Sequence, residues 1–471
     1  MVSMVRDGAI SPSELLDEHL RQIDARNPAV NAFVAVFAGQ AREEARAREA
    51  QMIRGEPLGL LHGVPVTVKD SFDIAGVPTR SGSRFRPTVS AARDAVAVAR
   101  LRAEGAIILG KTNTPDLLSS YESDNFLTGR TNNPWDLLRT PGGSSGGEAA
   151  AIAAFCSPGG IATDGGGSIR IPAHFCGIAG LKPTPGRIPT TGHFPSMGYP
   201  GGLTSVVGPM ARDATDLRLL FSVLTGYDAD DPFSTPVPLH HPDLTGQPPL
   251  HIGVWEQFYD VPVDPEIRDA VRRAAALLHG PCFEVSEFAP QGLNRAPNLW
   301  AFLFSQWPSI ITRALVEGRE YDAHWTLLES LPKGDPPSAE QVILNLGARD
   351  RMRAALLRQM EEVPVLVMPV SSIPAFHHRE RRWQVDGREI GIFQAMMPAV
   401  LANVLGLPAV TVPMGVTAAG LPIGVQLLGR PFEDELLLEI AIRLEESRGP
   451  FVGPADKASF TNQDQFTSSK D

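Results

Sequence analysis

Three side chains stand in local sequences that could support chemistry. Lys69 ends an apolar stretch that begins at Val64. Ser144 lies in the run Gly142-Gly143-Ser144-Ser145-Gly146-Gly147, and Ser168 follows 24 residues later, after three consecutive glycines. An amine and two hydroxyl groups can supply a base, a proton relay and a nucleophile without a histidine.

The surroundings of these side chains point to a particular reaction class. Burial disfavours the charged form of an amine, so Lys69 could act as a neutral base, although a lysine at a strand end can also reach out to solvent. The glycines before Ser168 let consecutive backbone N–H groups converge on an oxyanion, and a helix beginning at Ser168 would add to the field. The combination predicts acyl transfer at an amide or ester carbonyl.

Two literal motif matches do not fit their context. Residues 105–112 satisfy the phosphate-loop pattern GxxxxGK[ST], but a helix is expected before Gly105 and strand-forming residues stand where the loop should be. Residues 142–146 satisfy the nucleophile-elbow pattern GxSxG, but no apolar strand precedes them. We therefore expect a buried strand at the first site and no Ser-His-Asp triad at the second.

Histidines and cysteines offer no better site. None of the 11 histidines adjoins a motif that would make it a catalytic base. The three cysteines, Cys156, Cys176 and Cys282, are too scattered for a disulfide framework or a zinc site, which favours a reducing, cytoplasmic setting. Cys176 is close in sequence to Ser168, but its apolar neighbours would not favour a thiolate.

The elements that must position these residues alternate between helix and strand. Ser11-Pro12-Ser13-Glu14 has the pattern of a capping box and predicts the start of a helix, which Asn27-Pro28 is expected to end. A buried strand ends at Lys69, and a helix over 94–104 leads into a strand over 106–109. This order predicts an α/β fold with a largely parallel, helix-covered sheet.

Composition excludes several classes of protein. Of 471 residues, 43% are hydrophobic and 20% charged, which is typical of a globular protein with a large core. The net charge of −11, without a basic run, argues against nucleic acid as a partner. Residues 390–429 carry no charge, but prolines and glycines interrupt them too often for a membrane span. Short buried strands, such as 409–412 and 423–428, are expected there instead.

Several segments together resemble the amidase signature family. The similarity runs in order from about residue 10 to 450, and the agreement of independent segments in sequence and spacing makes it specific. The segments that carry it are the Lys69 strand, the GGSSGG run, Thr163–Ala173, Gly180–Thr184, Gly110–Asn113, Asn133–Asp136, Gly406–Ala409 and Gly420–Gln426.

The resemblance implies a role for each site residue. Ser168 would be the nucleophile, Ser144 a relay serine held by a cis peptide bond, and Lys69 the base. The backbone N–H groups of Gly165, Gly166, Gly167 and Ser168 would form the oxyanion hole, and neither a metal nor an organic cofactor is needed. Relatives often carry a larger side chain where Gly165 stands, so we expect a wider site around the carbonyl.

The resemblance also implies a large mixed β-sheet covered by helices on both faces, in a single domain over 1–458. Catalytic loops would occupy 60–215, a variable substrate region about 225–385, and the C-terminal core strands and helix 390–447. A flexible tail would follow at 459–471. The length alone would also suit about three domains, but no clean linker is visible.

The implied activity is hydrolysis of a small-molecule carboxylic amide to the carboxylate plus ammonia or an amine, through an acyl-enzyme on serine. Aromatic residues within 300–307 suggest an apolar acyl or aryl pocket, although core packing would explain their spacing as well. We expect no membrane partner. Whether the protein forms a homodimer stays an open question.

Two alternatives remain at this stage. The chain could be the glutaminase subunit of a tRNA-dependent amidotransferase, whose site needs an acidic and a basic side chain for the two charges of the amino acid. Arg379, Arg381 and Arg382 are basic candidates, but they lie in a charge run that we expect to be solvated. The second alternative is a ligand-binding relative that has no catalytic activity.

Overall fold

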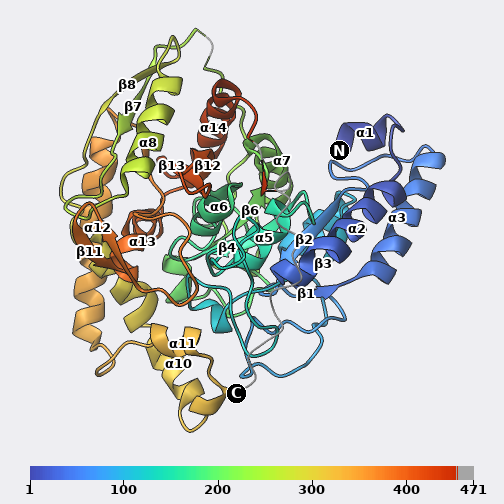
Figure 1. Ribbon diagram of the computed structural model, residues 1–471, viewed down its shortest axis with the longest axis horizontal. Helices are drawn as coiled ribbons and strands as arrows, with labels where there is room; N and C mark the ends of the chain where they lie inside the picture. Colours follow the sequence, from blue (N-terminus) through green and yellow to red (C-terminus); the bar gives the residue numbers. More distant parts are fainter. Residues whose placement is uncertain (245, 452, 455–471) are drawn as a thin grey trace.

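One large mixed sheet runs through the protein (Figure 1). The computed structural model describes residues 1–244, 246–451 and 453–454, so the tail predicted at 459–471 lies outside the described residues. Eleven strands pair in the order β1-β3-β2-β4-β6-β5-β12-β13-β9-β7-β8, and β10 and β11 form a separate hairpin. The strands are β1 (Phe33–Val36), β2 (Pro65–Lys69), β3 (Ile107–Thr112), β4 (Gly159–Asp164), β5 (Ala179–Lys182), β6 (Val206–Ala211), β7 (Leu250–Val254), β8 (Phe283–Glu287), β9 (Val365–Pro369), β10 (Arg382–Val385), β11 (Arg388–Gly391), β12 (Ala409–Val416) and β13 (Pro422–Leu428).

Helices and short helical turns connect these strands. They are α1 (Val2–Arg6), α2 (Pro12–Val30), α3 (Ala38–Ile53), α4 (Val96–Ala103), η1 (Asp116–Leu118), α5 (Gly146–Ala153), α6 (Arg170–Cys176), η2 (Gly201–Leu203), α7 (Ala214–Leu224), α8 (Pro265–Leu278), α9 (Ala296–Trp300), η3 (Ala301–Gln306), α10 (Ser309–Val316), η4 (Glu320–Asp322), α11 (Trp325–Ser330), α12 (Ala339–Gln359), α13 (Ile392–Val404) and α14 (Asp434–Arg448). No helix in the described part of the chain is long and apolar enough to cross a membrane.

The sheet is mixed rather than largely parallel. Strand β2 runs parallel to both β3 and β4, and β7 runs parallel to both β8 and β9. The remaining pairs are antiparallel, including the long β12–β13 pair. The expectation of a mostly parallel sheet was wrong because helix–strand alternation was visible only near the N-terminus, where the parallel β2–β3 pair forms.

Helices cover both faces of the sheet, as the mixed-sheet prediction required. On one face, Val66 and Val68 of β2 share a hydrophobic cluster with residues of α4, α7, α8 and α14. On the other face, α2 and α5 pack against Ile107 and Leu109 of β3. Because side chains alternate along a strand, Thr67 and Lys69 point to the face that α5 covers. The alternation therefore aims Lys69 at the Gly-rich loops.

Local predictions met two different outcomes. Helix α2 has the predicted capping box at Ser11 and Glu14, but it continues through Pro28 to Val30. Proline removes one N–H and need not end a helix within its last turn; here Asn31, with φ of 54°, ends it by donating its N–H to the Asn27 carbonyl. The buried strands predicted within 390–429 are β12 and β13, and α13 precedes them.

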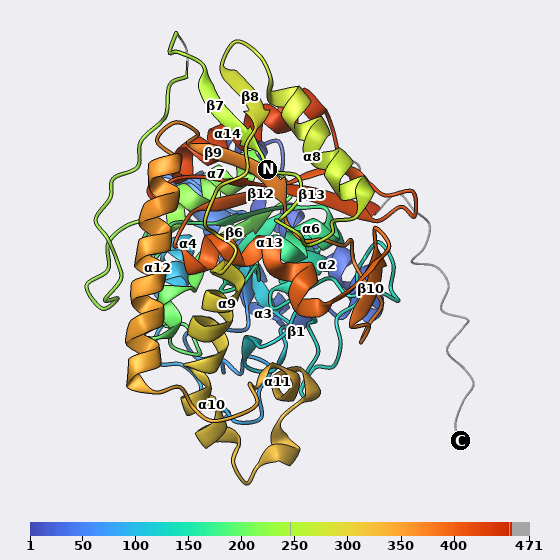
Figure 2. The same cartoon turned by 90° about the vertical axis from the view of Figure 1, so that its left-hand side faces the viewer.

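Part of the segment predicted to be variable, 296–330, forms helices at one end of the molecule, whereas α8 of the same segment lies at the other end (Figure 2). The aromatic stretch at 300–307 spans the end of α9 and the π-helical turn η3, and Pro308 separates η3 from α10. Figure 2 shows α10 and α11 at this end, far from α8 and α14. The described residues of 228–249 form no helix or strand.

Candidate active site

Lys69 is fully buried beneath the two Gly-rich loops. Its Nζ lies 2.8 Å from Ser144 Oγ, 2.8 Å from Ser145 Oγ and 2.9 Å from Thr163 Oγ1. The side chain is 0% exposed, so the alternative of a lysine that reaches solvent is wrong. Three hydroxyl groups surround one amine, which is an arrangement for passing protons rather than for pairing charges.

Burial makes the neutral form of Lys69 accessible near pH 7. Burial lowers the pKa of Lys69 to about 7, although the carboxylates of Asp164 and Glu148 oppose this shift. Glu148 is also fully buried, and it accepts hydrogen bonds from the hydroxyls of Thr67 and Thr112. Burial raises the pKa of Glu148 to about 7, so its own charge is only partly present beside the lysine.

Ser144 lies at the tip of the first loop, just before α5. The peptide bond between Gly143 and Ser144 is cis, as the resemblance implied. A Cβ at Gly143 would overlap the backbone of the segment at Ser120–Glu122, so only glycine lets the loop pack this closely. The Ser144 side chain is buried beside Lys69 and still reaches the edge of a cavity.

Asp164 holds the second loop, residues 164–170, in one shape. Its carboxylate accepts the Gly167 N–H at 2.8 Å and the Ile169 N–H at 3.1 Å, and it pairs with the buried Arg170 guanidinium at 3.0 Å. Burial opposes the charge of Asp164, but Arg170 and the hydrogen bonds outweigh it, so the pKa of Asp164 is lowered. Helix α6 begins at Arg170, two residues later than the start considered at Ser168.

Two carbonyl groups of this loop are held by side-chain donors from other segments. Trp300 Nε1 donates to the Gly165 carbonyl at 2.8 Å, and the Tyr121 hydroxyl donates to the Gly166 carbonyl at 3.0 Å. In a trans peptide the C=O and the following N–H point in opposite directions. Holding the Gly165 carbonyl therefore fixes the direction of the Gly166 N–H.

The predicted oxyanion hole needs one correction. The Gly167 N–H is engaged by Asp164 and is not available to a substrate. The N–H groups of Gly165, Gly166 and Ser168 have no acceptor among the described residues. The sequence could not distinguish these four amides, because the acceptor that captures Gly167 is a side chain of the same loop.

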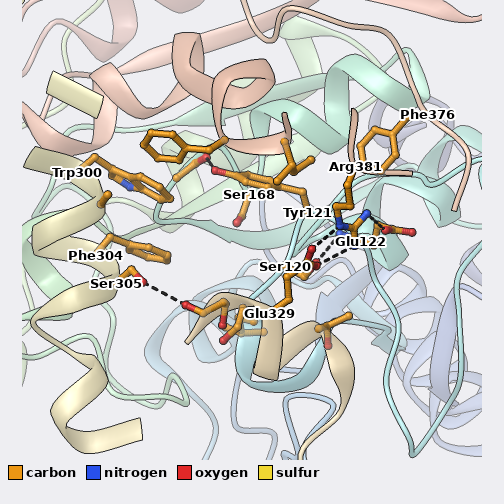
Figure 3. A pocket seen from close by; sticks show the side chains of 18 residues that line it. Ser120, Tyr121, Glu122, Ser168, Trp300, Phe304, Ser305, Glu329, Phe376 and Arg381 are labelled. Atoms are coloured by element: carbon orange, nitrogen blue, oxygen red, sulfur yellow. Dashed lines mark hydrogen bonds and ion pairs between the residues drawn. The ribbon is translucent and has the colours of Figure 1, made fainter. Parts of the chain in front are cut away.

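Ser168 lies where two cavities meet, and it is 8% exposed. The aromatic cavity, of about 220 Å³, is bounded by Tyr121, Trp300, Phe304, Phe376 and Phe393. Figure 3 shows Trp300 and Phe304 on one side of it, Tyr121, Glu122 and Arg381 on the other, and Ser168 between them. The second, larger cavity is called the neutral cavity here; its volume is about 460 Å³, and both Ser144 and Ser168 line it.

Gly165 does not widen the site around the carbonyl, contrary to expectation. A Cβ at this position would overlap the Phe304 ring and would lie 2.7 Å from Ser205 Oγ. The space that a larger side chain would take is therefore filled by Phe304, which stacks on Trp300 with ring centroids 5.0 Å apart. The missing side chain admits an aromatic wall instead of opening the site.

The aromatic residues of 300–307 divide between pocket and core. Trp300 and Phe304 line the aromatic cavity, whereas Phe302 is buried in a hydrophobic cluster with Leu303 and Leu401. Both interpretations of this stretch therefore hold, each for different residues. Sequence reasoning missed Tyr121, Phe376 and Phe393, which reach the cavity from three other segments and have no local signal.

The charge run at 377–382 is not uniformly solvated. Arg381 lines the aromatic cavity, where it pairs with Glu122 at 2.6 Å and with Glu329 at 2.6 Å. Arg382 does point outward and pairs with Glu389 on the β10–β11 hairpin. Arg379 donates its backbone N–H to the Glu122 carboxylate at 3.1 Å. The expectation of a solvated run was wrong for Arg381, because buried Glu122 draws it inward.

The remaining sequence candidates take structural places. Lys111 of the apparent phosphate loop lies in β3 and pairs with buried Asp70 at 2.8 Å, as expected for a buried strand. Cys176 is buried, and burial raises the pKa of its thiol well above the usual value. Among the described residues, no group of three or more His, Cys, Asp or Glu side chains could hold a metal ion.

Comparison with known proteins decides the family. The Amidase family profile matches residues 14–438. The chain belongs to the Amidase family. It is 33% identical to the indoleacetamide hydrolase of Bradyrhizobium diazoefficiens, over 94% of this chain and 85% of that protein. It is also 33% identical to a glutamyl-tRNA(Gln) amidotransferase subunit from Geotalea daltonii, over 93% of this chain and 94% of that protein.

A solved structure agrees with this assignment. A bacterial aryl acylamidase of the amidase signature family matches with a TM-score of 0.86 and 28% identity, covering 97% of each chain. The predicted fold, a mixed sheet covered on both faces by helices in a single domain, is confirmed. This amidase is a hydrolase that acts on the carbon–nitrogen bond of amides, as the sequence predicted.

Proposed function

We propose that this amidase hydrolyses amides through a serine acyl-enzyme, with Ser168 as nucleophile, Ser144 as proton relay and Lys69 as base. The observation that carries the proposal is the fully buried Lys69 amine, 2.8 Å from Ser144 Oγ. Ser144 and Ser168 both face the neutral cavity, so a substrate carbonyl there would meet both hydroxyls. The N–H groups of Gly165, Gly166 and Ser168 would hold the oxyanion.

The hydrogen-bond pattern sets the direction of the relay. A neutral amine has two N–H groups and one lone pair, so one of the three hydroxyls around Lys69 must donate to Nζ. The Ser145 hydroxyl donates to the Thr163 carbonyl at 3.2 Å, which leaves the hydroxyls of Ser144 and Thr163 as the possible donors. Of these two, Ser144 is the residue to which the family resemblance gives the relay role. The two serine hydroxyls are not hydrogen-bonded to each other in the described part of the chain, and such contacts commonly tighten when substrate binds.

The reaction then follows in two balanced steps. Ser168 Oγ bonds to the carbonyl carbon while its proton passes through Ser144 to Lys69. The carbon–nitrogen bond breaks as that proton returns through Ser144 to the leaving nitrogen. Water next attacks the acyl-enzyme, and its proton takes the same route to release Ser168 and the carboxylic acid. These steps need no metal ion or organic cofactor.

We further infer that the acyl group of the substrate is aromatic. The stacked rings of Trp300 and Phe304 form a flat wall, and Phe376 and Phe393 close the cavity beyond it. Planar apolar groups bind well against such surfaces. The likeness to an indoleacetamide hydrolase, whose name states an amide with an aromatic acyl group, supports the same class of substrate.

The glutaminase alternative rests on the likeness to the glutamyl-tRNA(Gln) amidotransferase protein, which is as strong in identity. Its site would need a free cation for the glutamine carboxylate. Arg381 is in the cavity, but its guanidinium is shared between Glu122 and Glu329, in a bidentate contact with the latter. An amino acid would have to displace these carboxylates, so we favour an uncharged aromatic amide.

The deciding experiment compares turnover of phenylacetamide, indoleacetamide and glutamine by the purified chain. We expect ammonia release from the first two to exceed release from glutamine by at least about a hundredfold. Ser168→Ala should lower turnover by more than about a thousandfold. Cys176→Ala is the matched control and should keep it, because the buried thiol has no thiolate character. Preference for glutamine would favour the amidotransferase role, and absence of turnover with all three would favour a binding protein.

Expectations about setting and assembly stay predictions. The three cysteines are free, which supports a reducing, cytoplasmic setting. The domain limits at 458 and the variable region at about 225–385 also stay predictions; that region does supply α9, η3, α10 and α11, which border the cavities. A homodimer can be tested by sedimentation of the purified chain.

A further inference from the structure

The two cavities at Ser168 differ in their access to the relay serine. Ser168 and Phe304 border both cavities, but Ser144 borders only the neutral cavity. Trp300 and Tyr121 border only the aromatic cavity. An amide bound across Ser168 has two halves, and each cavity can take one of them. The substrate could bind in two orientations, with the acyl group in either cavity. Because Ser144 borders only one cavity, these two orientations are not equivalent.

The direction of proton transfer decides which half of the substrate binds in which cavity. When the carbon–nitrogen bond breaks, the nitrogen must receive the proton that Ser168 gave up, and Ser144 is the group that returns it. The leaving nitrogen must therefore lie on the Ser144 side, with its substituent in the neutral cavity. The acyl group then extends into the aromatic cavity. This step rests on the proposed Ser168–Ser144–Lys69 relay.

The walls of the neutral cavity are uncharged and largely apolar, although hydroxyl side chains such as Ser196, Ser305 and Thr312 also border it. Pro195, Met197 and Tyr199 contribute one side, and Ile311 and Leu315 of α10 contribute another. No Asp, Glu, Lys or Arg borders it among the residues that the structure describes. His193 also borders it, and burial lowers the pKa of this imidazole to about 3, so it is neutral at pH 7. The aromatic cavity, in contrast, holds Glu122, Glu329 and Arg381.

The size of the neutral cavity exceeds what a primary amide needs. Its volume is about 460 Å³, whereas a molecule the size of water or ammonia occupies roughly 30 Å³. Cavities of about 300 Å³ and more commonly hold a whole small-molecule group. We propose that the neutral cavity binds the amine half of the substrate, and that this amidase hydrolyses N-substituted amides whose amine portion is apolar and uncharged.

A set of substrates with one shared acyl group tests this proposal. The set is phenylacetamide with its N-phenyl, N-butyl and N-(3-aminopropyl) derivatives, and the readout is kcat/KM. All four form the same acyl-enzyme, so differences report on binding and departure of the amine. We expect the N-phenyl and N-butyl amides to reach at least one tenth of the value of the primary amide. We expect the cationic aminopropyl amide to fall at least tenfold below the N-butyl amide.

A matched pair of variants on one helix locates the effect. Thr312 of α10 borders the neutral cavity, whereas Ile310 of α10 does not and is 45% exposed. Thr312→Trp should lower the ratio of N-butyl to primary amide kcat/KM at least tenfold, because the new ring narrows the cavity. Ile310→Trp should leave this ratio unchanged.

Each contrary result would overturn a different part of the proposal. If wild-type protein hydrolyses the primary amide but both neutral N-substituted amides fall below one tenth of its value, the amine-cavity proposal is wrong. If Thr312→Trp changes selectivity among acyl groups instead, the two halves bind the other way round. These outcomes are separate from failure of the relay, which would appear as full activity of Ser168→Ala on the primary amide.

Discussion

The floor and the walls of this active site are built by different rules. The floor consists of β2, the end of β4 and the two Gly-rich loops, where Lys69, Asp164 and Arg170 are fully buried and each is hydrogen-bonded. The walls come from α9, η3, α10 and the loop at 193–201, where exposure ranges from 7% for Trp300 to 68% for Tyr199. In the proposed mechanism, a buried hydrogen-bonded network would carry out proton transfer, while apolar side chains of varied exposure would set substrate choice.

Floor and walls touch at two points. Trp300 donates to the Gly165 carbonyl, and the Phe304 ring fills the space that a side chain at Gly165 would need. In the proposed mechanism, this wall residue would therefore help to orient the oxyanion hole. Substitutions in the floor should remove activity, those at the contact should reduce it moderately, and those in the walls should change selectivity.

The largest effect is expected from the relay serine. Ser144→Ala should lower kcat by about 10²- to 10⁴-fold, because it removes the hydroxyl that we propose carries the proton between Ser168 and Lys69. Ser145→Ala is the matched control, since Ser145 also contacts Lys69 Nζ at 2.8 Å but donates its own proton to the Thr163 carbonyl. Steady-state kinetics of both variants check this prediction. Equal losses would contradict a relay through Ser144.

The next effect concerns pH. Only neutral Lys69 can accept a proton, and its pKa is lowered to about 7, so protonation at lower pH removes the base. We expect kcat/KM to fall about tenfold for each pH unit below 7 and to level off above it. Lys69→Arg, which stays charged, should be inactive throughout. A flat profile of kcat/KM between about pH 5 and 8 would exclude Lys69 as the base.

A smaller effect is expected where the floor meets the walls. Gly165→Ala should lower kcat/KM by about tenfold, because overpacking costs about 1–3 kcal/mol and the new methyl would meet Phe304. In a Phe304→Ala background the same Gly165→Ala change should cost much less, since the obstructing ring is gone. A double-mutant cycle measured on one aromatic amide checks the coupling. Additive losses would show that the two residues do not interact.

The smallest effect is expected from Trp300→Phe. This change keeps the ring stacked on Phe304 but removes the hydrogen bond to Gly165, worth about 0.5–1.5 kcal/mol, or roughly 2- to 13-fold in rate. The loss should fall on kcat rather than KM, and the affinity for a trifluoromethyl ketone, which forms an oxyanion, should drop equally. Trp307→Phe, in a ring that does not border the aromatic cavity, should change neither.

The sequence predicted the floor better than the walls for a physical reason. Ser144, Ser168 and Lys69 stand in glycine-rich or apolar segments whose composition is itself the signal, so three catalytic candidates could be named. The mixed sheet that positions these residues was predicted from the family resemblance. Helix–strand alternation alone predicted a largely parallel sheet.

The walls depend on contacts between distant segments. Tyr121 and Phe376 meet Trp300 around one cavity although each lies in an ordinary local sequence. The loss of the Gly167 amide from the oxyanion hole likewise depended on where the Asp164 side chain turns. Such contacts can be seen only in the three-dimensional structure, because no local sequence pattern predicts them.

The central claim is that Ser168 carries the acyl group during turnover. Rapid acid quenching of the protein with an aromatic amide, followed by peptide mass spectrometry, tests it most directly. The account predicts one acyl adduct, on the peptide that contains Ser168, which is absent in Ser168→Ala. An adduct on Ser144 or Cys176 during active hydrolysis would contradict it.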